Sequence, residues 1–260
     1  MRAALALALF LILILGWGRA LAQANAAPRH QAALALVFAI DVSGSIGSDT
    51  YILERDGTAR AFLDPRVEKE IASLPGGIEA LVLEWSDPST IATAVPWTLV
   101  KDKRSAEAFA ASLRESKRSS YGLTAIGPAI LAAMAAFAHM PEPAARRVID
   151  ISGDGIANFG LSPALARDRA AAAGITINGL AILDKEPWLA GYYRHEVIAG
   201  PSAFVIKAES YDSFARAMRL KLESEIAGKV PAQLVETPRQ PRRFGAMQSG
   251  PPRCGRGFSG

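Results

Sequence analysis

The stretch VFAIDVSGSIGSD, residues 37–49, joins a run of apolar side chains to a cluster of polar ones. After the apolar residues, Asp41, Ser43 and Ser45 place one carboxylate and two hydroxyls at alternate positions. A short apolar run of this kind is typical of a buried strand, and Asp, Ser and Gly are common in the turn after any strand. The stretch therefore predicts a strand that ends either in an ordinary turn or at a point where three oxygen-bearing side chains converge.

Segments with the pattern of strands and of helices alternate on both sides of this stretch. This alternation predicts a mostly parallel sheet that is covered by helices on both faces. Pro96 cannot donate a ladder hydrogen bond, so its segment suits an edge of the sheet, and Ser48 is the expected N-cap of the first helix. The expected strands are 33–40, 78–85, 90–99, 147–151, 175–182 and 203–206, and the expected helices are 49–63, 105–115, 126–139, 163–173 and 211–226.

The two ends of the chain differ in composition from this alternating part. Residues 1–24 combine Arg2, an apolar run and the small-residue tripeptide Ala22-Gln23-Ala24, which is the pattern of a cleaved secretory signal. The run is short for a bilayer span, and an uncleaved membrane anchor is the alternative. Residues 231–260 hold five Pro, five Gly and five Arg with almost no apolar run, which predicts a disordered tail. We therefore expect a signal peptide (1–24), a linker (25–32), one domain (33–228) and a tail (229–260). The mature protein would be periplasmic or secreted, without a stable membrane span.

The basic character of the chain comes from its ends. The whole chain has 29 Lys and Arg against 25 Asp and Glu. Leaving out two arginines in 1–24, five in 231–260 and the acidic Glu236 gives 22 basic and 24 acidic residues, a net charge of −2 for residues 25–230. No basic groove is expected, which argues against nucleic acid as a partner. The single cysteine, Cys254, cannot form an internal disulfide, so an exported domain would depend on its hydrophobic core.

Polar side chains occupy three of the expected loops at the edge of the sheet where parallel strands end. Asp41, Ser43 and Ser45 follow the first strand, Thr124 precedes the helix 126–139, and Asp154 follows the strand 147–151. Functional groups of open α/β sheets collect at the carboxyl ends of the strands. Hydroxyl and carboxylate oxygens suit Mg²⁺, Mn²⁺ or Ca²⁺ rather than zinc.

These residues, in this order, resemble the metal-ion-dependent adhesion site (MIDAS) of von Willebrand factor A (vWA) domains. The resemblance implies a Rossmann-type three-layer α/β/α sandwich, mostly parallel with one antiparallel edge strand. It also implies that Ser43, Ser45 and Thr124 touch the metal directly, and that Asp41 and Asp154 hold it mainly through water. A carboxylate of a partner protein would fill the open coordination position. Tyr121 and Gly122, just before Thr124, are expected to line the partner surface.

The whole segment is similar to an uncharacterised family of exported bacterial vWA-like proteins. The phrases that carry this similarity are LERDGTARAFLDPRV, EWS, VPWTL, TAIGPAI, RRVIDISGDG and AAGITINGLAI. The resulting hypothesis is an exported, non-enzymatic module that binds a protein partner through a divalent metal.

Two other functions stay open. A metal held by oxygen ligands can activate water, so a metal-dependent hydrolase is the first alternative. The three histidines His30, His139 and His195 have neither metal-ligand nor triad spacing. The second alternative is a structural exported domain whose site is empty.

Two acidic residues in the strands need separate interpretation. Asp150 lies inside a buried strand, where a carboxylate needs a partner. It either supports the site or, as we favour, pairs within the core. Glu84 ends the strand 78–85 and either faces the metal rim or, as we favour, is an ordinary strand-end charge.

Overall fold

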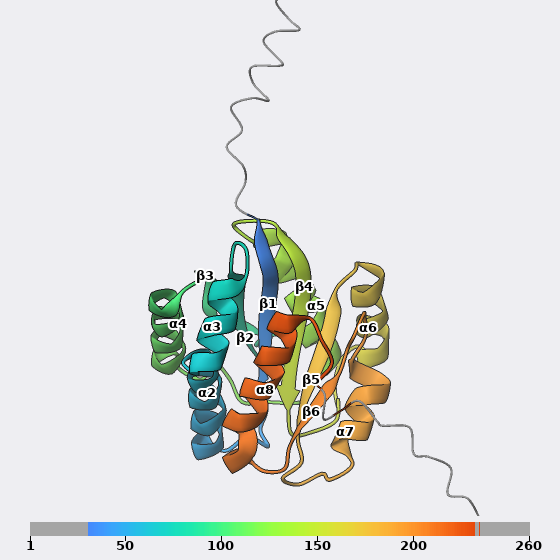
Figure 1. The fold of residues 1–260 in the computed structure, drawn as a ribbon. Helices are drawn as coiled ribbons and strands as arrows, with labels where there is room; N and C mark the ends of the chain where they lie inside the picture. Colours follow the sequence, from blue (N-terminus) through green and yellow to red (C-terminus); the bar gives the residue numbers. More distant parts are fainter. Residues whose placement is uncertain (1–30, 232–233, 235–260) are drawn as a thin grey trace, which may run out of the picture.

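A computed structural model describes residues 31–231 and 234, which form a six-stranded sheet between two layers of helices (Figure 1). The strand order is β3-β2-β1-β4-β5-β6. All neighbouring strands are parallel except β3, which runs antiparallel to β2 at one edge. This architecture confirms the expected fold class. The strands are β1 (Ala32–Asp41), β2 (Ile78–Trp85), β3 (Ala92–Val100), β4 (Ala144–Gly153), β5 (Thr176–Ile182) and β6 (Val205–Ala208).

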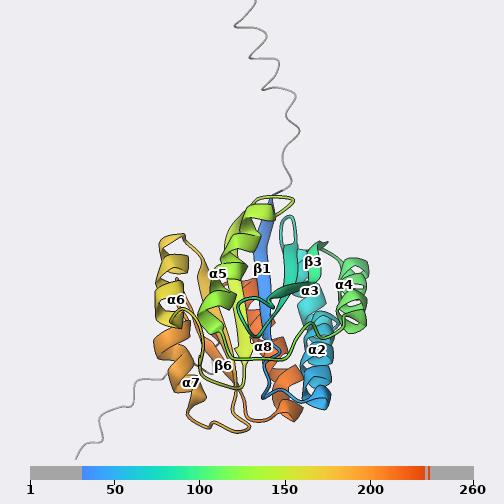
Figure 2. The ribbon, with the colours of Figure 1, turned by 180° about the vertical axis from the view of Figure 1, so that it is seen from behind.

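The helices divide between the two faces of the sheet, and Figures 1 and 2 show the two faces from opposite sides. One face is covered by α2 (Ser48–Phe62), α3 (Pro65–Ser73), α4 (Lys103–Glu115) and α8 (Phe214–Ala227). The other face is covered by α5 (Ile126–Ala136), α6 (Pro163–Ala172), α7 (Leu189–Tyr192) and the π-helical turn η2 (Tyr193–Val197). Two short 3₁₀ turns, η1 (Phe137–His139) and η3 (Tyr211–Ser213), complete the set.

Strand β1 is central and is buried on both faces. Leu34, Leu36 and Phe38 enter the core under α2 and α8, whereas Ala35 and Val37 enter the core under α5 and α6. A parallel strand covered on both faces must be apolar at nearly every position, which is why its sequence reads as one continuous apolar run.

The register brings the ends of three strands together. Asp41 at the end of β1 lies opposite Trp85 at the end of β2, and Ile40 lies opposite Ser152 of β4. The chain leaves β1 toward β2 on one side and later returns to its other side as β4. The β1–β4 boundary is therefore the switch point at which open α/β sheets bind ligands.

Several local expectations were wrong. Helix α3 was missed because Pro65 reads as a stop, yet proline is well suited to the first turn of a helix, and Asp64 caps this one by accepting from Arg66 N at 2.9 Å. The N-cap of α2 is Gly47 and not Ser48, and no side chain caps that helix. The turns α7 and η2 were also missed, and β6 lies two residues later than expected because its pairing with β5 starts at Val205.

The expected signal peptide and most of the linker and tail lie outside the described residues. At the boundary of the expected tail, Val230 and Leu234 pack against the core on the α8 face. No helix in 31–231 combines the length and the apolar character needed to cross a membrane.

Candidate metal centre

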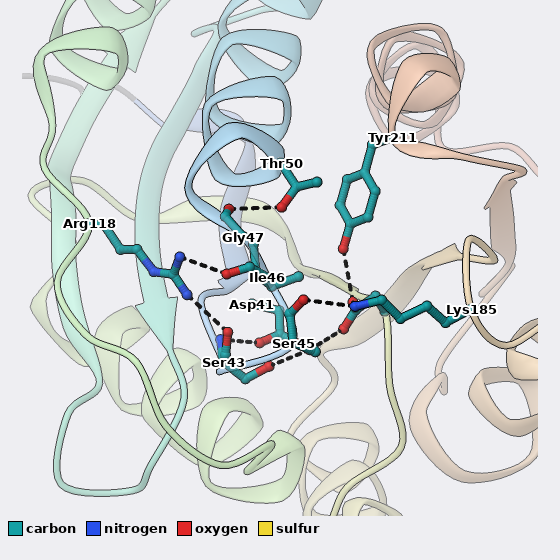
Figure 3. A network of polar contacts seen from close by, with 10 residues as sticks. Asp41, Ser43, Ser45, Ile46, Gly47, Thr50, Arg118, Lys185 and Tyr211 are labelled. Atoms are coloured by element: carbon teal, nitrogen blue, oxygen red, sulfur yellow. Dashed lines mark hydrogen bonds and ion pairs between the residues drawn. The ribbon is translucent and has the colours of Figure 1, made fainter.

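The loop after β1 folds its polar side chains around Asp41 (Figure 3). Asp41 is fully buried, and its Oδ1 accepts a hydrogen bond from Ser43 N at 2.7 Å. Its other oxygen, Oδ2, is buried without a hydrogen-bond partner among the described residues. Ser43 Oγ lies 3.1 Å from Ser45 Oγ. The alternate spacing of these residues thus brings one carboxylate and two hydroxyls together, which is the second of the two arrangements that the sequence left open.

Asp154, which follows β4, joins this cluster from a second loop. Ser45 Oγ donates to Asp154 Oδ1 at 2.6 Å, and the phenol of Tyr211 in η3 donates to Asp154 Oδ2 at 2.9 Å. Lys185, in the loop after β5, reaches the same place, with its Nζ 2.9 Å from Ser45 O and 3.7 Å from Asp154 Oδ2. The contacts of Tyr211 and Lys185 had no signal in the sequence, because each depends on loops that only the fold brings together.

Thr124 faces the cavity that Ser45 and Asp154 also line. The cavity has a volume of about 260 Å³. Asn158 fixes the threonine by accepting from Thr124 N at 2.8 Å, and Asn158 N donates to Thr124 O at 3.0 Å. The three loops singled out in the sequence therefore meet at one cavity. Its lining consists of Ser45, Thr124, Asp154, Gly155, Ile156, Asn158, Lys185, Glu186 and Trp188.

Arg118 holds the loop after β1 in place. Its guanidinium donates to the backbone oxygens of Ile46 (2.8 Å), Val42 (2.8 Å) and Ser43 (2.9 Å). The cation also lies over the ring of Tyr121, 3.6 Å from the centroid. Sequence reasoning missed Arg118, since a basic residue in a polar loop looks like an ordinary surface residue.

Tyr121 and Gly122 lie on the loop that approaches the loop after β1. Tyr121 is 64% exposed, while Gly122 O accepts from Gly44 N at 2.8 Å. A Cβ on Gly122 would lie 2.1 Å from Asp87 Oδ2, so any larger residue would have to displace the Asp87 carboxylate, which accepts from Leu123 N. Tyr121 thus offers an exposed aromatic surface, whereas Gly122 positions the loop.

Burial determines the electrostatics of the centre. Loss of hydration raises the pKa of Asp41 to about 7, although the hydrogen bonds from Ser43 act in the opposite direction. Burial also raises the pKa of Tyr193 well above its usual range, and its phenol oxygen has no partner in the described part of the chain. Buried oxygens without a partner need a hydrogen-bond donor or a cation.

The donor set fits a hard divalent cation. Three hydroxyls and two carboxylates from the three loops are all oxygen donors. Within the described ranges, no group of three or more His, Cys, Asp or Glu side chains is arranged to hold a metal. A cation here would therefore depend on the hydroxyls of Ser43, Ser45 and Thr124.

The two strand carboxylates have other roles. Asp150 contacts Lys221 of α8, with Nζ 2.8 Å from Oδ2, which confirms that it pairs within the core. Glu84 is buried and accepts from Tyr51 OH at 2.7 Å and from Ser119 N at 2.6 Å. It neither faces the cavity nor lies on the surface, so both interpretations of Glu84 were wrong. Instead, it fixes the start of the loop 119–124 against α2.

Comparison with known proteins identifies the fold and a family. Residues 31–230 match a family described as "Protein of unknown function (DUF1194)". No curated protein matches the sequence. Among solved structures, proximal thread matrix protein 1 of the mussel byssus is similar over 74% of this chain and 47% of its own, with 16% identity and a TM-score of 0.56. That protein has also been solved with a zinc-occupied MIDAS motif.

Two bacterial structures give the same result. The pilus adhesin SpaC of Lactobacillus rhamnosus GG covers 75% of this chain at 13% identity with a TM-score of 0.57, over 30% of its own length. The vWF domain of the pilus tip protein Mfa5 of Porphyromonas gingivalis covers 76% at 11% identity with a TM-score of 0.53, over 96% of its own length. This chain thus spans less than half of the mussel protein and of SpaC, and at these identities the likeness establishes the vWA-like fold.

Proposed function

The chain belongs to the family of unknown function DUF1194, and we propose that it is an exported module that binds a protein partner through a divalent cation. The cation would be held by Ser43, Ser45 and Thr124, with Asp41 and Asp154 behind them. The observation that carries this proposal is the meeting of three separate loops at one cavity, beside a buried carboxylate oxygen that lacks a partner.

The chemistry of this donor set favours binding over catalysis. Bound at largely neutral hydroxyls, a divalent cation keeps enough positive charge to attract a carboxylate of a partner. Ser45 and Thr124 line the cavity, while Asp41 and Ser43 lie deeper. The proposed ligands would therefore surround the cation on its interior side and leave the side that faces the cavity open. The described lining contains no histidine, the commonest general base, and its two hydroxyls and Asp154 are the groups proposed to hold the cation.

The rim of the cavity provides apolar contacts for a partner. Ile156 and Trp188 line the cavity and are 43% and 55% exposed, and Tyr121 and Leu123 are exposed on the neighbouring loop. Aromatic side chains at the edge of a polar centre are common anchors in protein interfaces. The expected partner therefore presents an acidic side chain with apolar neighbours.

Calorimetric titration of the purified chain with Mg²⁺, Mn²⁺, Ca²⁺ and Zn²⁺ tests the proposal. The wild type should bind at least one of these ions, and Thr124→Ala should abolish or strongly weaken binding. Thr98→Ala is the matched control, because Thr98 is a half-buried residue of the edge strand β3 whose hydroxyl donates to Pro96 O. Zinc is included because the mussel MIDAS motif accepts it.

A second experiment tests partner binding. Capture from an exported fraction should depend on the metal identified by titration and should be lost with chelator and with Asp41→Ala. A chain that binds none of the four ions at millimolar concentration would favour the structural domain with an empty site. Saturable hydrolysis of phosphate-ester or peptide substrates that disappears in Asp41→Ala would favour the hydrolase.

A further inference from the structure

Glu54 of α2 has a buried carboxyl group with no visible partner. The residue is 0% exposed, and neither Oε1 nor Oε2 has a hydrogen-bond partner among the described residues. Glutamate is almost never fully buried unless it is paired, because loss of hydration is costly for its charge. Glu54 therefore needs an explanation that the ligand set of Asp41, Asp154 and the hydroxyls does not give.

The carboxyl group of Glu54 belongs to the interior side of the candidate centre. The charges of Asp41 and Asp154 both act on it, and its own charge acts on the phenols of Tyr193 and Tyr211. Helix α2 packs against η3, and Tyr211 of η3 donates to Asp154, so the helix that carries Glu54 contacts the element that holds Asp154.

Unpaired oxygens cluster in this interior region. Asp41 Oδ2 and Tyr193 OH also lack partners in the described part of the chain. A Cβ placed on Gly153 would lie 2.8 Å from each of these two atoms, so both oxygens lie beside the end of β4. Together with Glu54, whose charge acts on Tyr193 and is acted on by that of Asp41, they form a buried polar layer.

The charges in this layer do not balance within the chain. Three carboxyl groups, those of Asp41, Glu54 and Asp154, have two cations near them, the guanidinium of Arg118 and the largely exposed ammonium of Lys185, which lies 3.7 Å from Asp154 Oδ2. The hydrogen bonds of Arg118 go to backbone oxygens, so the guanidinium forms no ion pair with these acids. With every group ionised, one negative charge remains in excess, and loss of hydration makes that state costly unless a cation from solution is bound.

We propose that Glu54 supplies a third negative charge to the cation centre from the interior of the domain, as a positioning residue and not as a ligand. This inference rests on the proposed function. The three acids are not arranged to hold an ion directly, so Glu54 acts at a distance. Two charges separated by protein interior interact more strongly than two charges in water. A buried carboxylate without a partner can therefore attract a cation that it does not touch.

Metal affinity of a charge-removing variant tests the role of Glu54. Glu54→Gln keeps the shape of the side chain and removes its charge, and we expect its affinity for Mg²⁺ or Mn²⁺ to fall by about tenfold or more. Glu54→Asp keeps the charge and should retain more of the affinity than Glu54→Gln. Glu79→Gln is the matched control, because Glu79 is also buried with an unpaired Oε2, but lies at the opposite end of β2.

The proposal also predicts the melting temperature of Glu54→Gln, and a purely structural role of Glu54 predicts a different result. Under the proposal, neutralising an unpaired buried acid leaves the melting temperature of the metal-free chain unchanged or raises it, and the increase that metal causes becomes smaller. If the wild type binds metal and Glu54→Gln binds it equally well, the inference is wrong and the proposed function stands. If the wild type binds no metal, the proposed function itself fails.

A second neutral variant provides the same test if Glu54→Gln does not fold. Glu54→Leu removes the buried polar group altogether, and the same loss of metal affinity is expected. Wild-type affinity in either neutral variant overturns the inference. Failure of both to fold, with and without metal, would show that the fold itself requires Glu54 and would also overturn it.

Discussion

The sheet carries two groups of buried acids, and only one of them contains a cation of its own. In the first group, Lys221 of α8 lies 2.8 Å from Asp150 Oδ2 and 2.6 Å from Glu225 Oε1, and all three side chains are buried. Asn178 adds a hydrogen bond of 2.9 Å to Glu225. In the second group, the candidate centre, Asp41, Glu54 and Asp154 are equally buried, but no lysine or arginine of the described residues is buried with them.

The difference indicates which group has a structural role and which is open to a ligand from solution. Lys221 comes from the same chain, so Asp150 and Glu225 are satisfied when α8 packs on the sheet. Burial raises the pKa of Asp150 to about 7, and the nearby ammonium of Lys221 opposes that shift. At the candidate centre, Lys185 is the lysine that reaches the acids, and its side chain is 55% exposed and 3.7 Å away. The charge that balances this second group is therefore expected from solution.

Removal of Lys221 should have the largest effect on stability. Lys221→Met leaves Asp150 and Glu225 buried without their cation, which costs about 3–5 kcal/mol for a broken buried pair. At about 2–4 °C for each kcal/mol in a domain of this size, the melting temperature should fall by roughly 10 °C. Thermal unfolding monitored by circular dichroism measures the change, and added Mg²⁺ should not reverse it.

Lys207→Met is the control for this substitution. Lys207 is an exposed lysine of β6, and its loss should change stability by about 0.5 kcal/mol or less. The double variant Asp150→Asn with Lys221→Met should recover part of the lost stability, because one of the two uncompensated charges is gone. Equal melting temperatures for Lys221→Met and the wild type would show that the buried lysine does not compensate the acids.

Metal binding should have the next largest effect on the melting temperature, and this effect should depend on the second group of acids. An ion that binds only the folded chain stabilises it by about 2.7 kcal/mol at a concentration one hundred times its dissociation constant. The melting temperature should then rise by roughly 5–10 °C and return to its first value with chelator.

Two variants assign this increase to the candidate centre. Asp154→Asn removes a charge from the second group and should lose most of the increase, whereas Lys221→Met should keep it despite its lower starting temperature. An increase of the same size in Asp154→Asn would place the stabilising ion elsewhere and remove the distinction between the two groups.

The sequence predicted the residues that lie at strand ends better than those that lie on helices. Asp41 and Asp154 follow parallel strands, and such ends must meet at one edge, so their proximity follows from the strand pattern alone. Thr124 could be added because the resemblance to vWA domains marks its loop.

Glu54 and Lys221 were missed for a common reason. Each lies in a helix rich in charged residues, where one more charge reads as solvent-exposed. A helical stripe could have identified Glu54, since it is three residues after Tyr51 and four before Thr58, which are both buried. Even then, whether a buried acid has a partner depends on contacts between distant segments.

Substitution of Lys185 should have the smallest effect on stability, because Lys185 is the exposed counterpart of the buried Lys221. Its ion pair with Asp154 is largely hydrated, and such pairs contribute about 0–1 kcal/mol. Lys185→Met should therefore change the melting temperature of the metal-free chain by only a few degrees at most. Metal affinity should rise by less than about fivefold, since a positive charge that repels the incoming cation is removed, and the gain should shrink at high salt. If metal binding is instead lost in Lys185→Met, the lysine is an essential part of the cation centre. The contrast between acids that are balanced by a lysine of the chain and acids that are balanced by an ion from solution would then no longer hold.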